Sequence, residues 1–74
     1  MNYAQRIRDL REDKDMNQTQ IAEILHTSQT VYSRYERGER PLPIECLIKL
    51  CKFYNTSPEY ILGFTNIPKP LPKK

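Results

Sequence analysis

The sequence predicts an all-α protein of five short helices. Apolar residues recur at intervals of three and four along several segments, as on one face of a helix, and they nowhere alternate as in a strand. Residues that cap helix N-termini precede these segments, and glycine or proline follows them. The chain of 74 residues is the size of one small domain, whose limited core would compete with a deep catalytic cleft.

The first two helices are expected at residues 3–13 and 18–25. The apolar stripe of the first consists of Tyr3, Ile7 and Leu10. Asn17 is suited to cap the N-terminus of the second helix, which is short and ends at the turn that follows.

A third helix is expected at residues 29–37, between the N-cap Ser28 and Gly38, which readily adopts the left-handed conformation past a helix end. Its apolar residues are Val31, Tyr32 and Tyr35. Two prolines in the loop at residues 39–43 prevent the helix from continuing.

The fourth helix, at residues 44–54, has the most regular apolar spacing in the chain. Its stripe consists of Ile44, Leu47, Ile48 and Cys51, widened by Leu50 and Tyr54. The fifth helix is brief: Ser57 caps it, Pro58 fits the first helical position and Gly63 ends it.

The folded domain is therefore expected to span residues 1–63, followed by a Pro/Lys-rich C-terminal tail at residues 64–74. This tail has no acidic residue and should be extended or disordered. The formal net charge of +3 is a mild bias toward polyanions. Because no apolar run is long enough for a membrane span or a signal peptide, we expect a cytoplasmic protein that does not bind membranes.

Metal, cofactor and catalytic chemistry are not expected. Cys46 and Cys51 lie five residues apart, which is not a zinc-binding spacing, and the chain has one histidine, so we interpret both cysteines as reduced thiols. His26 is interpreted as a turn residue rather than a catalytic base. No cluster of titratable groups can be assembled around it, so a small enzyme ranks last among the possible functions.

Two short helices separated by only three residues, 26–28, are the most informative feature of the chain. A turn of this length sets the helices at a steep angle, as in the DNA-binding helix-turn-helix. The first helix then braces the second, whose polar face enters the major groove. The sequence thus predicts a helix-turn-helix from about Gln18 to Arg37.

Polar side chains gather on the second helix of this motif, on the side away from Tyr32 and Tyr35. Gln can pair bidentately with adenine, Arg with guanine, and Thr can contact the methyl group of thymine. The candidate base-contacting residues are Ser28, Gln29, Thr30, Ser33 and Arg34. Phosphate contacts are expected from Gln18 at the start of the motif and from Arg37 and Arg40 at its end.

Several stretches resemble the Cro/C1-type (XRE family) helix-turn-helix domains, namely residues 16–25, 27–29, 32–41, 47–52 and 57–63. The run SRYERGERP after the IAEIL helix is quite specific, and the likeness covers residues 3–63. The resemblance implies a compact five-helix bundle of the lambda-repressor-like DNA-binding type, with the helix-turn-helix at helices 2 and 3. It also implies a transcriptional regulator, since members are usually repressors that bind operators as homodimers.

Carried over residue by residue, the resemblance implies base contacts from Gln29, Thr30 and Arg34, with Ser28 and Ser33 nearby. It adds Asn17 to the phosphate-contacting residues Gln18, Arg37 and Arg40, and it implies a structural ion pair between Arg11 and Glu36. The chain departs from the family at His26, where glycine is usual. A left-handed turn there would strain histidine by about 1–2 kcal/mol.

The expected function is sequence-specific binding of double-stranded DNA by a homodimer on a palindromic operator, with repression of transcription. A protein-interaction module, such as an antitoxin or an anti-regulator, is the alternative from another class. Such a module should show an apolar patch where this chain has Gln29, Thr30, Ser33 and Arg34, so the polarity of this face favours DNA. Both roles can coexist, because the fifth helix and the tail are free for a protein partner.

Overall fold

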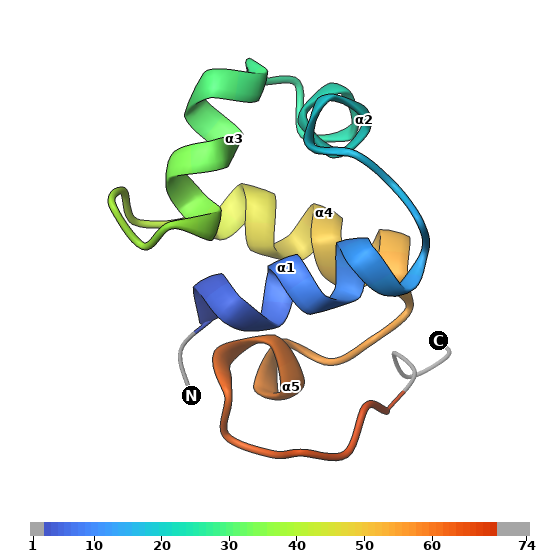
Figure 1. Cartoon of the computed structure of the whole chain (residues 1–74). Coiled ribbons are helices and arrows are strands. Elements are labelled where there is room, and N and C mark those ends of the chain that lie inside the picture. Colours follow the sequence, from blue (N-terminus) through green and yellow to red (C-terminus); the bar gives the residue numbers. More distant parts are fainter. Residues whose placement is uncertain (1–2, 70–74) are drawn as a thin grey trace.

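The computed structural model describes residues 3–69, which fold into five helices without a strand (Figure 1). The helices are α1 (Tyr3–Asp13), α2 (Gln18–Ile24), α3 (Gln29–Glu36), α4 (Ile44–Tyr54) and α5 (Pro58–Leu62). The predicted all-α fold class is confirmed, and the helix bounds differ from expectation by at most one residue, because Leu25 and Arg37 are C-caps. Within residues 3–69, no helix is both long and apolar enough to cross a membrane.

Side chains close the N-termini of α2, α3 and α5. At α2, Asn17 Oδ1 accepts a hydrogen bond from the Gln20 backbone N–H (2.8 Å), and Gln20 Oε1 accepts one from the Asn17 backbone N–H (2.9 Å). The hydroxyls of Ser28 and Ser57 each accept from a backbone N–H three residues on, at 3.1 and 3.2 Å. Because each cap stabilises a helix by about 1 kcal/mol, these short helices begin where the sequence predicts.

The core lies where α1 crosses the bundle, with α5 on one side of it and α2 and α3 on the other (Figure 1). Helix α1 packs against α3 and α5, α2 packs against α3, and α4 packs against α5. Each helix contributes one fully buried side chain to this core, and these are Ile7, Ile21, Tyr32, Leu50 and Ile61. Burying an aliphatic or aromatic side chain of this size contributes about 1.5–3 kcal/mol, so the five contacts hold all the helices in one unit.

Helix α4 buries only part of the apolar stripe that its spacing predicts. Ile44 is 70% exposed and Ile48 is 50% exposed. The buried face of α4 consists of Cys46, Leu50, Cys51 and Tyr54. The apolar residues of α4 occupy more than one side of the helix, so their spacing could not show which side faces the core.

The two cysteines are free thiols in the structure. Cys46 and Cys51 both lie on the buried face of α4, in the core. Burial raises the pKa of both thiols, so they stay protonated at neutral pH. This agrees with their interpretation as reduced thiols.

Residues 64–69, the start of the predicted tail, have no helix but are fastened to the bundle by Arg6. Arg6 Nη2 donates to Asn66 Oδ1 (3.2 Å), and its guanidinium lies 4.0 Å from the centre of the Tyr60 ring. Phe64 and Ile67 remain largely exposed. Residues 70–74 of the predicted tail lie outside the described part of the chain, so the extended or disordered tail stays a prediction.

The turn after α2 passes through the left-handed region at His26, whose φ is 57°. The Thr27 backbone N–H donates to the Ala22 carbonyl (3.0 Å) and fixes this conformation. A β-carbon in this region is strained by about 1–2 kcal/mol. The turn thus has the shape for which glycine is suited, although the chain carries histidine there.

Replacing His26 with glycine is expected to raise the free energy of unfolding by about 0.5–1 kcal/mol. Relief of the backbone strain is partly offset because glycine gains conformational entropy in the unfolded chain. Urea denaturation measures the change. His26→Ala is the control, since it keeps the β-carbon and should not raise the free energy of unfolding. If alanine raises it as much as glycine does, the destabilisation comes from the imidazole ring and not from backbone strain.

Candidate nucleic-acid interface

Helices α2 and α3 form a helix-turn-helix at one end of the bundle, with α5 at the opposite end (Figure 1). Residues 25–28 connect them, one residue more than the sequence indicated, because Leu25 belongs to the turn. The buried side chains of Ile21, Leu25 and Tyr32 hold the two helices together. The class of protein that this arrangement defines is the helix-turn-helix domain.

The outer face of α3 presents an exposed polar strip, formed by Gln29, Thr30 and Arg34. On the inner face, Tyr32 and Tyr35 are buried and meet edge to face, with ring centroids 6.3 Å apart. Their burial fixes the rotation of α3 about its own axis. The strip therefore points outward, and within residues 3–69 the Arg34 side chain forms no ion pair.

Two of the predicted base-contacting residues lie apart from this polar strip. Ser28 is exposed, but its hydroxyl accepts the capping hydrogen bond from the Val31 backbone N–H. Ser33 is buried, because Arg37 folds back over it and donates from Nη1 to Ser33 Oγ (3.0 Å). In this conformation Ser33 positions Arg37 and has no open path to a ligand in front of α3.

A chain of hydrogen bonds links the polar strip to the core. Gln29 Nε2 donates to Gln18 Oε1 (2.6 Å), and Gln18 Nε2 donates to Glu36 Oε1 (3.1 Å). Arg11 completes the chain from α1, since its Nε lies 2.7 Å from Glu36 Oε2 and its Nη2 lies 3.0 Å from Oε1. The geometry thus brings Arg11 and Glu36 together as the resemblance implies, and it joins Gln18 to Gln29, which the sequence did not indicate.

The Glu36 carboxylate is ionised at neutral pH although its side chain is only 3% exposed. Burial alone would raise its pKa, but hydrogen bonds from Arg11 and Gln18 and the Arg11 charge together hold that pKa below its ordinary value. The Arg11 pKa is raised in turn, mainly by its hydrogen bond to Glu36. The pair fixes α3 to α1 and thereby sets the orientation of the outer face.

The candidate phosphate contacts lie at the two ends of the motif. At one end, the Asn17 side chain is engaged in the capping box, while Gln18 has its backbone N–H at the first turn of α2. At the other end, Arg37 Nε pairs with Glu39 Oε2 (2.9 Å), and both side chains are about half exposed. The exposed Arg40 forms no ion pair within residues 3–69, so its charge is available to a ligand.

Tyr3 holds the loop that carries Arg40, a role that the sequence pattern did not reveal. Its hydroxyl donates to the Arg40 carbonyl (3.3 Å) and accepts from the Leu42 backbone N–H (3.2 Å). The apolar spacing of α1 placed Tyr3 with the core, which accounts for its ring but not for its hydroxyl. A tyrosine at the edge of an apolar stripe is the signal that could have suggested a polar partner.

The chain is similar to known proteins in both sequence and structure. A family model described as helix-turn-helix matches residues 7–61. The chain is 35% identical over 68 residues to YobD, an uncharacterized HTH-type transcriptional regulator of Bacillus subtilis (strain 168), covering 92% of this chain and 61% of that protein. It is 36% identical over 52 residues to RstR, a cryptic phage CTXphi transcriptional repressor of Vibrio cholerae, covering 70% and 47%.

Among solved structures, the chain matches the P22 c2 repressor crystallised in complex with synthetic operator 9T. The TM-score is 0.79 at 28% sequence identity, and the match covers 88% of this chain and 98% of that one. The predicted lambda-repressor-like bundle is thereby confirmed. The chain belongs to the helix-turn-helix family of the Cro/C1 (XRE) type. It spans about half the length of the curated relatives that it matches.

Proposed function

We propose that this protein binds double-stranded DNA sequence-specifically and represses transcription as a homodimer on a palindromic operator. The observation that carries the proposal is the exposed strip of Gln29, Thr30 and Arg34 on α3, outside a core that fixes the rotation of that helix. A single helix fits the major groove of B-DNA, where these side-chain types distinguish base pairs. The P22 c2 repressor, with the same fold, is known in complex with an operator, which supports the proposal.

Each side chain of the strip has a distinct role. Arg34, which is free of ion pairs within residues 3–69, donates two hydrogen bonds to a guanine. Gln29 reads an adenine in an orientation held by Gln18, and the methyl group of Thr30 contacts a thymine. Arg37, Arg40, Asn17 and the backbone N–H of Gln18 bind phosphates on either side. A dimer bound over a promoter then represses by excluding RNA polymerase.

Selection of bound sites from random DNA tests this function, because it reports base preference, symmetry and half-site spacing together. The wild-type chain should return a palindrome with half-sites about 34 Å, or one helical turn, apart. Recovery of random sequence, or of no DNA at all, contradicts the proposal.

Replacing Arg34 with alanine should relax the preference at one base position of each half-site. The expected loss of discrimination is about 1–3 kcal/mol per half-site, while the other positions keep their preferences. Arg8→Ala, on the outer surface of α1, is the matched control and should leave the selected site unchanged. If the Arg34 variant loses affinity for operator and random DNA equally, Arg34 contacts a phosphate and its assignment to a base is wrong.

A further inference from the structure

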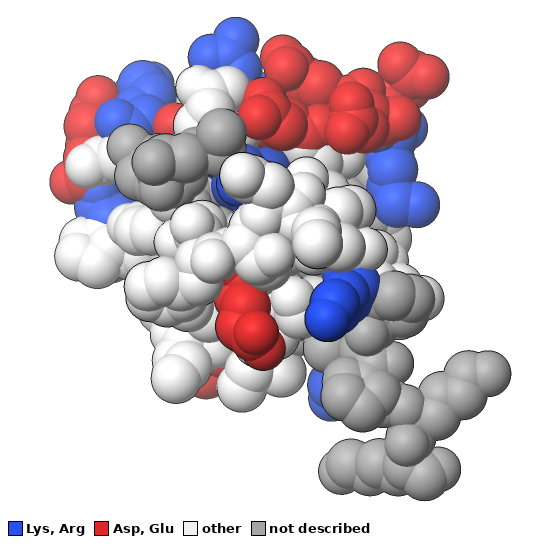
Figure 2. Space-filling view, turned by 90° about the horizontal axis from the view of Figure 1, so that it is seen from below, with Lys and Arg blue, Asp and Glu red and all other residues white. Residues whose placement is uncertain are grey.

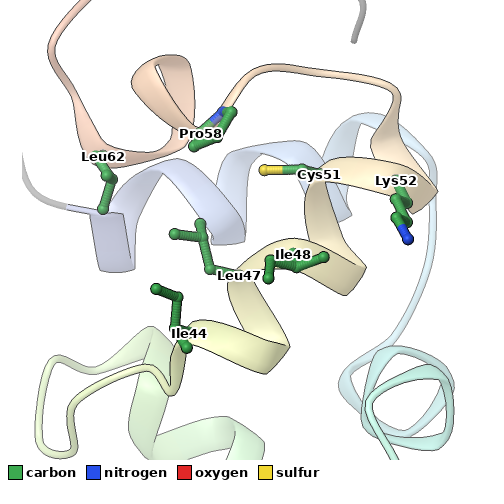
Figure 3. Close-up of a pocket in the computed structure, with 7 residues that line it drawn as sticks. All are labelled: Ile44, Leu47, Ile48, Cys51, Lys52, Pro58 and Leu62. Atoms are coloured by element: carbon green, nitrogen blue, oxygen red, sulfur yellow. The ribbon is translucent and has the colours of Figure 1, made fainter. Parts of the chain in front are cut away.

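An apolar groove lies at the surface between α4 and α5, and its volume is about 390 Å³ (Figure 3). The residues that line it are Ile44, Leu47, Ile48, Cys51, Lys52, Pro58 and Leu62. Two of these lining residues, Ile44 and Ile48, also protrude from α4 and are 70% and 50% exposed. Apolar surface gathered in this way on a small domain marks a site of protein contact.

The charges of α4 flank this apolar surface in a definite order. Glu45 lies in the first turn of the helix and Lys52 in the last turn, and both are exposed. Together with Ile48 they are spaced at i, i+3 and i+7, which places the three on one side of the helix. Within residues 3–69 neither Glu45 nor Lys52 forms an ion pair. This stripe, Glu45-Ile48-Lys52, is therefore acidic at one end, apolar in the middle and basic at the other end.

We infer that the groove and the stripe bind a second copy of this chain, with α4 antiparallel to α4 of the partner about a two-fold axis beside Ile48. This inference rests on the proposed homodimer and locates its interface. Glu45 and Lys52 lie about 10 Å apart along the helix, so reversal about Ile48 brings Glu45 opposite Lys52 of the partner subunit at both ends. Ile44 and Ile48 of each copy fill the groove of the other.

The complementarity of the face with itself favours a second copy over an unrelated protein. In a two-fold dimer each surface must match its own image, and here a hollow adjoins a protrusion while an acid mirrors a base. The interface also leaves DNA binding free, because no residue of α2 or α3 lines the groove. Seen from the α5 end, much of the surface is uncharged, with an acidic and a basic side chain near its middle and more acidic side chains gathered along one edge (Figure 2). That end is suited to protein contact rather than to DNA.

Charge reversal in the full chain tests this interface, with sedimentation measured in the absence of DNA. Glu45→Lys and Lys52→Glu each place like charges opposite one another twice, so each variant alone should dimerise at least about tenfold more weakly. Mixing the two variants should restore the wild-type association, because every contact in the mixed dimer then joins opposite charges. Ile48→Ser, which removes the apolar centre, should leave monomers whose circular dichroism spectrum shows the same helix content as the wild type.

Asp13→Lys, at the end of α1, is the control because it changes the net charge as much as Glu45→Lys does. It should dimerise like the wild type. The inference is overturned if both reversals dimerise normally, if their mixture fails to recover, or if the wild-type chain is monomeric. Site selection separates this failure from failure of the proposed function. If the inferred α4 interface is incorrect but α3 does bind the bases, site selection still recovers the same half-site sequence.

Discussion

Replacing Glu36 with alanine is expected to lower the free energy of unfolding by about 3–5 kcal/mol, the typical cost of breaking a buried ion pair on one side. The carboxylate accepts hydrogen bonds from Arg11 at 2.7 and 3.0 Å and from Gln18 at 3.1 Å. Its loss leaves the Arg11 guanidinium, whose side chain is only 13% exposed, without an acidic partner. The penalty arises from this uncompensated charge more than from the attraction that is lost.

Urea denaturation followed by circular dichroism measures this cost. The matched control is Glu12→Ala, which breaks the exposed pair with Arg8 on α1 and should change stability by less than about 0.5 kcal/mol. A second control replaces both partners by apolar residues, Arg11→Met with Glu36→Leu, and should recover much of the loss. If Glu36→Ala costs no more than Glu12→Ala, the pair does not hold α3 to α1.

Acidification separates the charge of Glu36 from its packing. Because its pKa is lowered in the folded state, the ionised form contributes stability that is present above the ordinary value of 4.5 and is lost as pH falls through the folded pKa. The wild-type chain should therefore lose stability below about pH 4.5. The Glu36→Ala variant should lose less over the same range.

Spacing and capping residues predicted the helices well because both signals are local. The N-caps Asn17 and Ser28 form the predicted hydrogen bonds. The left-handed backbone expected at His26 is present. What spacing could not predict is which side of a helix the rest of the fold covers. Ile44 and Ile48 belong to the most regular apolar stripe, but they are exposed because the core covers another side of α4.

The candidate site was predicted less completely, because its details depend on contacts between side chains far apart in the sequence. Helical spacing put Ser33 beside Arg34, but only the folded chain shows Arg37 lying over it. Gln18 and Gln29 are eleven residues apart, and their hydrogen bond exists because α2 and α3 pack together. The burial of Arg6 likewise needs α5 and residues 64–69, which no pattern within α1 could indicate.

DNA binding is expected to weaken about 10²–10³-fold when salt is raised from about 50 to about 200 mM. Each protomer presents the two phosphate-binding cations Arg37 and Arg40 at the end of the motif, so a bound dimer neutralises about four phosphates. Each neutralised phosphate releases counterions and contributes about −0.9 to the slope of log affinity against log salt. Fluorescence anisotropy with a labelled operator measures this slope.

Arg37→Ala identifies which side chains produce this slope. The variant should make the slope less steep by about 2 per dimer and should weaken binding to operator and random DNA alike. Arg8→Ala removes an equal charge from the outer surface of α1 and should leave the slope unchanged. If the two variants behave alike, the salt dependence reflects overall charge and the phosphate contacts of Arg37 are refuted. If the affinity of the wild-type chain does not change with salt, phosphate binding by these residues is refuted, because contacts to DNA phosphates release counterions.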